Sequence, residues 1–391
     1  MKVLDIRILN PFNIFLLMLF CVLLQILQLT NAISVVTPIY LVFVSVCLIA
    51  FIIPGILFQP KREKIFFSNV NYKKDYIFFI KAIYFISLFT NLYEYFYFFQ
   101  RFGNIPILLA DFEVKRLLFP INGYVHLIAM LHFPLIGFFY WVSKVDNKAI
   151  SKKEIVFYFF MSGTLSLMIG NRGTFSIMLI NIFIIKMILS SISYRKLIFF
   201  FVIFLYLLGA FKLFRDFSFY GDSVFKTIDD NSVFSGNWIT GAFFYSYNTL
   251  VMNFEFLLLY LEENIPHQYG YFTVISPFAS FLPFDLMTEQ EFQKNHLDIS
   301  FHGTITGTGF AIPYIDFGPF APVLVFLITA VFYYLRLKLV SRKLIYLIPG
   351  IVYFYINLLL FFYTYTFNKF YILLNIIMLF FISIFSIRTY R

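Results

Sequence analysis

Ten apolar runs recur along the chain, and no other feature restricts its fold as strongly. Most are close to the length of about 20 residues that a helix needs to cross a bilayer. Only 13% of the 391 residues are charged, whereas a soluble protein has about 25%. We therefore expect an all-α integral membrane protein with about ten transmembrane helices. Their expected extents are 11–29, 34–58, 76–99, 124–142, 155–169, 174–190, 196–214, 319–337, 344–363 and 370–387.

The lysines and arginines are distributed unequally between the two sides of this arrangement. Nineteen of the 30 lie at the two termini and in the connections that follow even-numbered runs, and nine lie in the other connections. Because cytoplasmic loops are rich in Lys and Arg, we expect both termini in the cytoplasm. The net charge of +10 then faces the anionic inner leaflet. It gives no reason to expect a nucleic-acid partner.

Two connections on the opposite, extracytoplasmic side are too long to be simple turns. Residues 100–123 are half apolar, and we expect them to form an outer interfacial segment. Residues 212–318 form a large extracytoplasmic loop between helices seven and eight, with twelve acidic and four basic residues. Within it, 241–261 is long enough to cross, but crossing would move the basic stretch RLKLVSRK outside, so we expect a helix at the outer interface. Residues 1–391 are expected to form a single polytopic membrane domain.

The stretch MIGNRGTFSIM, residues 168–178, places Arg172 in a tight turn between two apolar runs. A guanidinium is permanently charged, and burying it alone in hydrocarbon is costly. Its planar fork matches a diphosphate, and the flanking glycines let a ligand approach. Arg215 follows the seventh run at a similar depth, and Arg101 and Arg116 lie in the smaller outer connection. All four arginines are candidate substrate-binding residues; the alternative is that each reaches toward lipid head groups.

The end of the large loop, SFHGTITGTGFAIPYIDFGPFAPV, has the glycines and prolines of a shaped loop and contains His302, Tyr314 and Asp316. A histidine or a carboxylate at this place could take a proton from a sugar hydroxyl. We therefore single out His302 and Asp316 as candidate catalytic residues and Tyr314 as a candidate substrate-binding residue. The alternative is that they serve the loop architecture and the start of the next helix.

The chain has none of the motifs that hold nucleotides or catalytic metals. It lacks G-x-x-x-x-G-K-[ST], H-E-x-x-H, G-x-S-x-G and C-x-x-C. Its two cysteines, Cys21 and Cys47, lie in the first two apolar runs and make no metal signature. We expect no metal site and no cofactor, so the energy of any reaction must come from an activated substrate.

Together these features resemble the bacterial O-antigen and capsule repeat-unit polymerases of the Wzy type. The resemblance covers most of the chain and includes GNIPIL after the third span, GNRG at 170–173, the long outer loop, and TGTGFAIPYIDFG at 306–318. It implies a metal-independent glycosyltransferase of the bacterial inner membrane, related in fold to the O-antigen ligases and with its active site facing the periplasm. Such an enzyme transfers a glycan from undecaprenyl diphosphate to the terminal sugar hydroxyl of another lipid-linked repeat unit.

The same resemblance implies the partners and the roles of two arginines. The partners are the undecaprenyl-diphosphate-linked oligosaccharide and the membrane lipids, and a chain-length regulator is a further candidate. Arg172 matches the glycine-arginine turn and would hold the diphosphate. Arg215 is assigned only by its place at the start of the long loop, because the loop lacks the arginine-then-glycine spacing that some members show.

Other functions fit a similar layout. An O-antigen ligase uses the same donor with a lipid A-core acceptor, and a flippase or another transporter would line its bundle with charges. Lys81, Glu94 and Lys186 fall inside the expected spans, and each is expected near a span end or in a local pair. His126 and His132, near the fourth span, are expected to form hydrogen bonds between helices, which argues against a membrane acyltransferase.

Overall fold

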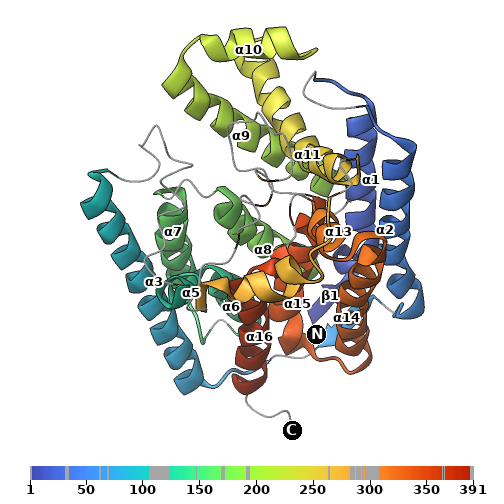
Figure 1. The fold of residues 1–391 in the computed structure, drawn as a ribbon. Coiled ribbons are helices and arrows are strands. Elements are labelled where there is room, and N and C mark those ends of the chain that lie inside the picture. The colour runs from blue at the N-terminus through green and yellow to red at the C-terminus, as the bar shows by residue number, and fades with distance from the viewer. Residues whose placement is uncertain are drawn as a thin grey trace.

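The computed structural model describes residues 2–30, 35–60, 63–67, 70–104, 123–146, 148–168, 172–190, 194–262, 265–281, 287, 292, 295, 308–362, 364 and 366–387. It is mostly helical (Figure 1), which confirms the all-α class. The α-helices are α1 Phe12–Ile26, α2 Pro38–Leu57, α3 Lys74–Phe102, α5 Gly123–Ala129, α6 His132–Val145, α7 Lys152–Met168, α8 Arg172–Ser190, α9 Tyr194–Tyr220, α10 Ser223–Asn231, α11 Trp238–Glu262, α13 Ala311–Phe317, α14 Ala321–Ser341, α15 Ile348–Leu359 and α16 Phe370–Phe385. Short helices include η1 Arg7–Leu9, η3 Tyr271–Ile275, η4 Ser276–Phe281, η5 Gly318–Phe320, η7 Leu360–Phe362 and η8 Thr366–Asn368.

The helices occur where the apolar runs predicted them. Five helical stretches are long and apolar enough to cross a membrane: Pro38–Leu57, Lys74–Phe102, Gly123–Val145, Ile198–Tyr220 and Ala311–Ser341. Four shorter apolar helices, Phe12–Ile26, Thr174–Ser190, Ile345–Leu359 and Phe370–Phe385, coincide with further predicted spans. The remaining predicted span, 155–169, corresponds to α7, which begins with two lysines and a glutamate. The number of helices that cross the membrane therefore stays a prediction.

Local sequence explains several helix ends. Pro38 is the first residue of α2, a position where the missing backbone N–H costs nothing. Helix α3 ends at Gly103, whose φ of +72° is the left-handed conformation that glycine adopts at little cost.

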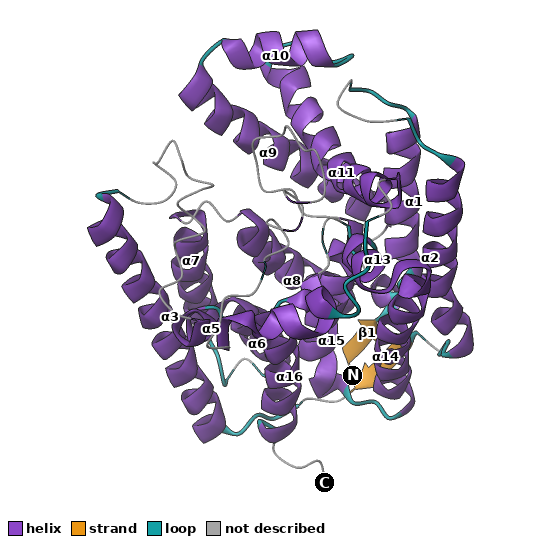
Figure 2. Ribbon diagram, in the orientation of Figure 1, coloured by secondary structure: helices purple, strands orange, loops and turns teal. Residues whose placement is uncertain are grey.

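One end of the bundle carries a two-stranded antiparallel sheet that the sequence did not predict, drawn in orange in Figure 2. Strand β1 Lys2–Asp5 pairs with β2 Lys64–Phe67. Tyr72 then forms a bridge with Ile387, and its backbone N–H donates to the carboxylate of Asp146 at 3.1 Å. We call this the strand end. It gathers the N-terminal segment and the connections after α2, α6 and α16, which were predicted from their Lys and Arg content to share one side.

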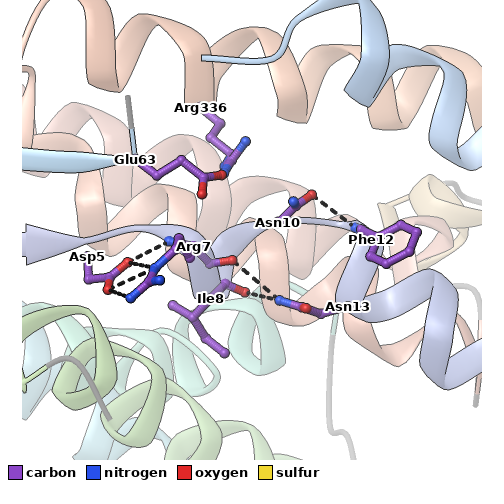
Figure 3. Close-up of polar contacts among 8 residues, drawn as sticks. All are labelled: Asp5, Arg7, Ile8, Asn10, Phe12, Asn13, Glu63 and Arg336. Atoms are coloured by element: carbon purple, nitrogen blue, oxygen red, sulfur yellow. Dashed lines mark hydrogen bonds and ion pairs between the residues drawn. The ribbon is translucent and has the colours of Figure 1, made fainter. Parts of the chain in front are cut away.

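Helix α14 reaches the strand end with a buried arginine. The Arg336 side chain is 1% exposed, and its Nη2 donates to Oε1 of Glu63 at 2.5 Å (Figure 3). The backbone carbonyl of Glu63 accepts the N–H of Ile6 at 3.0 Å, so the ion pair joins α14 to the sheet. Asp5 and Arg7 pair on β1 and η1 (Figure 3). Burial raises the pKa of the Asp5 carboxyl, but the hydrogen bonds and charge of Arg7 more than offset this and leave the pKa below its usual value.

The pair between Arg336 and Glu63 predicts an asymmetric effect of mutation. Glu63→Ala should cost about 3 kcal/mol, because it leaves the buried guanidinium without an opposite charge. Arg336→Met should cost less, since the Glu63 side chain is 28% exposed and water can solvate it. Thermal unfolding of the purified variants in detergent measures both. Equal losses of stability would show that the charge of Arg336 is satisfied in another way.

Helices α3 and α7 leave the strand end side by side. Lys81 of α3 pairs with Glu154 of α7 at 2.5 Å, and further along the hydroxyl of Tyr95 donates to the carbonyl of Leu165. Both helices therefore end away from the sheet, at what we call the far end. Helices α14 and α16 run back toward the sheet, so they begin at the far end.

Two of the three charged residues expected inside the spans form local pairs, and the third lies near a helix end, as predicted. Lys81 pairs with Glu154, and both carboxylate oxygens of Glu94 lie 3.3 Å from Nδ1 of His126. Lys186 is exposed on α8. The expected hydrogen bond between helices is confirmed for His132 of α6, whose Nδ1 lies 2.8 Å from Oγ of Ser162 on α7.

Helices α9 and α11 form a long hairpin joined by α10 (Figure 1). Helix α9 continues to Tyr220, beyond its predicted end at 214. In α11, the Ser246 hydroxyl donates to the Leu205 carbonyl of α9 at 2.8 Å, and Phe254, Leu257 and Leu258 are fully buried. The second half of 241–261 packs on protein, and the prediction that this helix lies at the outer interface stays a prediction. Its apolar residues there also contact α1.

Candidate active site

The site residues predicted from sequence lie at the far end wherever the structure describes them. Helix α7 ends at Met168 and α8 begins at Arg172, so Arg172 follows directly on the far end of α7. The N–H groups in the first turn of a helix have no partner within it and give that end a partial positive charge. The side chain of Arg172 lies outside the described part of the chain, as do Arg116 and His302.

Arg101 has the surroundings of a surface cation. It lies in the last turn of α3 and is exposed. Its guanidinium carbon is 5.4 Å from the ring centre of Phe102, the next residue. This favours the alternative interpretation of Arg101 as a cation that reaches toward head groups.

Arg215 belongs to a small charged group on the hairpin. Its Nη2 lies 3.2 Å from Oδ1 of Asp216, and Nζ of Lys212 lies 5.0 Å from the ring centre of Tyr245 on α11. Burial, and then the charge and hydrogen bond of the Asp216 carboxylate, raise the pKa of the Tyr245 phenol. Because a carboxylate already accompanies Arg215, its attraction for a diphosphate is weaker than that of an isolated arginine.

Asp316 is an anchor for a second segment and does not have the surroundings of a general base. Its carboxylate is fully buried; Oδ1 accepts the backbone N–H of Phe272 at 3.0 Å and Oδ2 that of Thr273 at 2.6 Å. A general base must reach the hydroxyl that it deprotonates. Both oxygens of Asp316 instead bind the start of η3, so we assign it a positioning role.

His267 lies beside this anchor and was not singled out from the sequence. The N–H groups of Gln268 and Tyr269 donate to the carbonyls of Ile315 and Asp316, each at 2.9 Å, which fixes the segment that carries His267 against α13. The predicted ligand Tyr314 has its ring centre 5.7 Å from that of His267 and 5.0 Å from that of Phe43 on α2. Tyr314 and Asp316 are thus brought together in one cluster with His267, in which Asp316 is fully buried and the two rings are half-buried.

The histidine ring rests directly on a glycine. Gly318 has a φ of +55° and a ψ of −130°, and a Cβ built on it would lie 2.3 Å from Nε2 of His267. Within the described residues, the buried Nδ1 of His267 has no hydrogen-bond partner. The site therefore holds a hydrogen-bonding atom that no described residue uses.

Gly318→Ala should lower the free energy of unfolding by more than the cost of backbone strain at this position alone. The strain of a positive φ costs about 1–3 kcal/mol, and the new methyl group would also displace His267. Gly103→Ala is the matched control, because Gly103 has a φ of +72° and no described atom within 4 Å of the place its new methyl group would take. Adding His267→Ala to Gly318→Ala should recover the difference in thermal stability between the two single variants. No recovery would mean that the ring does not oppose the methyl group.

Glu94 of α3 and His126 of α5 form a third polar group at the far end. The Glu94 side chain is fully buried and the His126 side chain is 26% exposed. The ring of Tyr371, at the start of α16, meets the His126 ring edge to face with centres 6.2 Å apart. Helix η4 contacts α5 and continues from η3, so residues 271–281 connect this pair to the anchor at Asp316.

The sequence held a signal for this pair that the prediction did not use. Glu94 lies eight residues before the end of α3, and His126 lies just inside the next helix. Two consecutive antiparallel helices place such positions at similar depth, and both groups need a partner in apolar surroundings. His267 gave no comparable signal, because its neighbours come from α13, which follows about 50 residues later.

Comparison of the chain with models of protein families, with curated proteins and with solved structures found no match.

Among the described residues, no group of three or more His, Cys, Asp or Glu side chains could hold a metal ion. The described residues at the far end include acid–base groups, aromatic rings and cations.

Proposed function

We propose that this protein polymerises lipid-linked oligosaccharide repeat units, transferring the glycan from undecaprenyl diphosphate to the terminal sugar hydroxyl of another unit, as in O-antigen or capsule synthesis. The observation that carries the proposal is the place of Arg172. It is the first residue of α8, at the far end of the bundle. The connections rich in Lys and Arg gather at the opposite end, the strand end. A diphosphate at the periplasmic surface of the inner membrane would meet a permanent cation at this position.

The proposed reaction needs little beyond positioning and charge stabilisation. The acceptor hydroxyl loses its proton, its oxygen bonds to the anomeric carbon of the donor, and the bond from that carbon to the diphosphate breaks. Arg172, helped by Arg215, stabilises the charge that the leaving diphosphate gains. Holding donor and acceptor together supplies much of the remaining rate.

The proposed location is the bacterial inner membrane, with both termini in the cytoplasm and the far end facing the periplasm. The excess of Lys and Arg in the connections at the strand end supports this orientation. Cysteine labelling tests it directly. A cysteine introduced next to Asp146 should react with an impermeant reagent only in inverted vesicles, and one in α10 only in intact spheroplasts.

Purified protein, reconstituted with lipid-linked repeat units, tests the activity. A ladder of polymer without added nucleotide would support the proposal. Transfer only to a supplied lipid A-core acceptor would identify an O-antigen ligase, and movement of units across the membrane without bond formation would identify a flippase. Either outcome would overturn the polymerase assignment.

A further inference from the structure

Glu94 and His126 have the geometry of a carboxylate that orients a histidine base. Both carboxylate oxygens lie 3.3 Å from Nδ1 of the ring. An ionised carboxylate can only accept hydrogen bonds, so Nδ1 carries the proton and Nε2 presents its lone pair. Among the described residues, His126 is the one side chain within hydrogen-bonding distance of Glu94.

The outer nitrogen of His126 is free to meet a substrate. The His126 side chain is 26% exposed, no described residue forms a hydrogen bond with Nε2, and Nε2 is not among the buried atoms that lack a partner. By contrast, Nε2 of His132 is buried and His132 is fully buried as a whole, so this second histidine cannot reach a ligand. Of the two, only His126 combines a positioned ring with an accessible nitrogen.

The surroundings of the ring leave Glu94 as its electrostatic partner. Among the described residues, α5 contacts α3, which carries Glu94, and η4, whose sequence SPFASF has no titratable group, and the His126 ring meets Tyr371 of α16. A carboxylate without water around it stabilises the positive charge that an imidazole gains when it accepts a proton. Since an unpaired charge buried in apolar surroundings is costly, Glu94 also gains from that transfer.

We propose that His126, oriented by Glu94, is the general base for the acceptor sugar hydroxyl, an inference that rests on the proposed polymerase function. The O–H bond breaks and its proton moves to Nε2 of His126. The oxygen uses the electron pair that it retains to bond to the anomeric carbon. The bond from that carbon to the diphosphate breaks, and its electron pair leaves with the diphosphate. His126 then returns the proton to water. His126 is the catalytic residue in this step, and Glu94 is a positioning residue.

The position of the pair agrees with this role. It lies at the far end, where the candidate cations lie, and residues 271–281 connect it to the Asp316 anchor. Tyr371 borders the ring and offers an aromatic face, the kind of surface on which the C–H face of a sugar stacks. Phe278 and Phe370 pack with ring centres 5.0 Å apart and hold η4 against the start of α16.

The test uses the full-length protein in proteoliposomes with lipid-linked repeat units. His126→Gln should lower kcat by about 100-fold or more with little change in KM, since proton transfer by a positioned group contributes about 10²–10⁴-fold. Glu94→Gln retains a hydrogen-bond acceptor and should lower kcat by about tenfold. His132→Gln is the matched control, and its rate per folded molecule should stay within about threefold of wild type.

Two further readouts separate catalysis from structure. The pH–rate profile should change shape between wild type and His126→Gln, because a glutamine at this position cannot take up a proton. Imidazole added to His126→Gly should restore several-fold activity, and added to His132→Gly it should have no effect. If His126→Gln does not fold, Glu94→Gln and the imidazole rescue carry the test.

The outcomes distinguish the two proposals. A wild-type protein that makes no polymer overturns the proposed function and the base assignment together. An active wild type with His126→Gln within threefold of it overturns the base assignment alone. Loss of all activity in His302→Gln, with His126→Gln unimpaired, would transfer the role to His302.

Discussion

Arg172→Ala should reduce polymer formation by about 100-fold or more in a protein that folds normally. Removing one preorganised donor from a developing negative charge costs about 10²–10³ in kcat. Arg172 begins α8, and the N-terminus of a helix carries a partial positive charge of its own. Initial rates of polymer formation in proteoliposomes measure the effect.

Arg172→Lys separates charge from shape. Lysine keeps the positive charge but loses the planar fork that binds a diphosphate at two points. We expect its rate to lie between those of wild type and Arg172→Ala. The matched control is Arg342→Ala, because Arg342 is an exposed arginine directly after α14, at the strand end. Polymer of normal length and rate from folded Arg172→Ala would remove Arg172 from the mechanism.

The two-ended arrangement of the protein could be predicted from charge alone. The Lys and Arg count assigned the segments around β1, Tyr72 and Asp146 to one side, and strand pairing and a backbone hydrogen bond join those segments in space. Long apolar runs also fixed where helices form, since only a helix satisfies its own backbone within hydrocarbon. Both predictions depend on the free energy of transferring side chains from water into a membrane. This quantity can be summed over a short stretch of sequence without knowledge of the fold.

Packing between distant segments could not be predicted in this way. An apolar helix such as α11 has the same composition whether it contacts lipid or protein, so its burial against α9 and α1 was missed. The sheet was missed because β1 and β2 are four residues each and pair across about 60 residues.

The sequence indicated which residues to consider for a site, but not what each of them contacts. Arg172, Tyr314 and Asp316 were identified by residue type and position, and all three belong to helices that begin at the far end. Residue type could not distinguish a carboxylate that acts on substrate from one that binds backbone. The partners of Asp316 lie more than 40 residues earlier, at Phe272 and Thr273.

Asp316→Ala should destabilise the protein by about 2–5 kcal/mol. The substitution leaves the buried N–H groups of Phe272 and Thr273 without acceptors, and each unsatisfied buried group costs about 1–3 kcal/mol. Asp316→Asn keeps one acceptor oxygen, so its loss of stability should be smaller than that of Asp316→Ala. Its NH2 group still leaves the other backbone N–H without an acceptor. Thermal unfolding in detergent and protease cleavage within 265–281 measure the release of this segment.

The same two variants distinguish an anchor from a general base. If Asp316 only positions η3, activity should fall in proportion to the loss of folded protein. At low temperature, where Asp316→Asn is folded, its rate per folded molecule should then stay within a few-fold of wild type. A general base at Asp316 would give the opposite pattern, because an amide cannot take the proton even when the fold is intact. The carboxylate of Asp316 is fully buried and accepts two backbone hydrogen bonds, which argues against a catalytic role. A fully folded Asp316→Asn with a rate lowered about 100-fold would therefore show that Asp316 is catalytic after all.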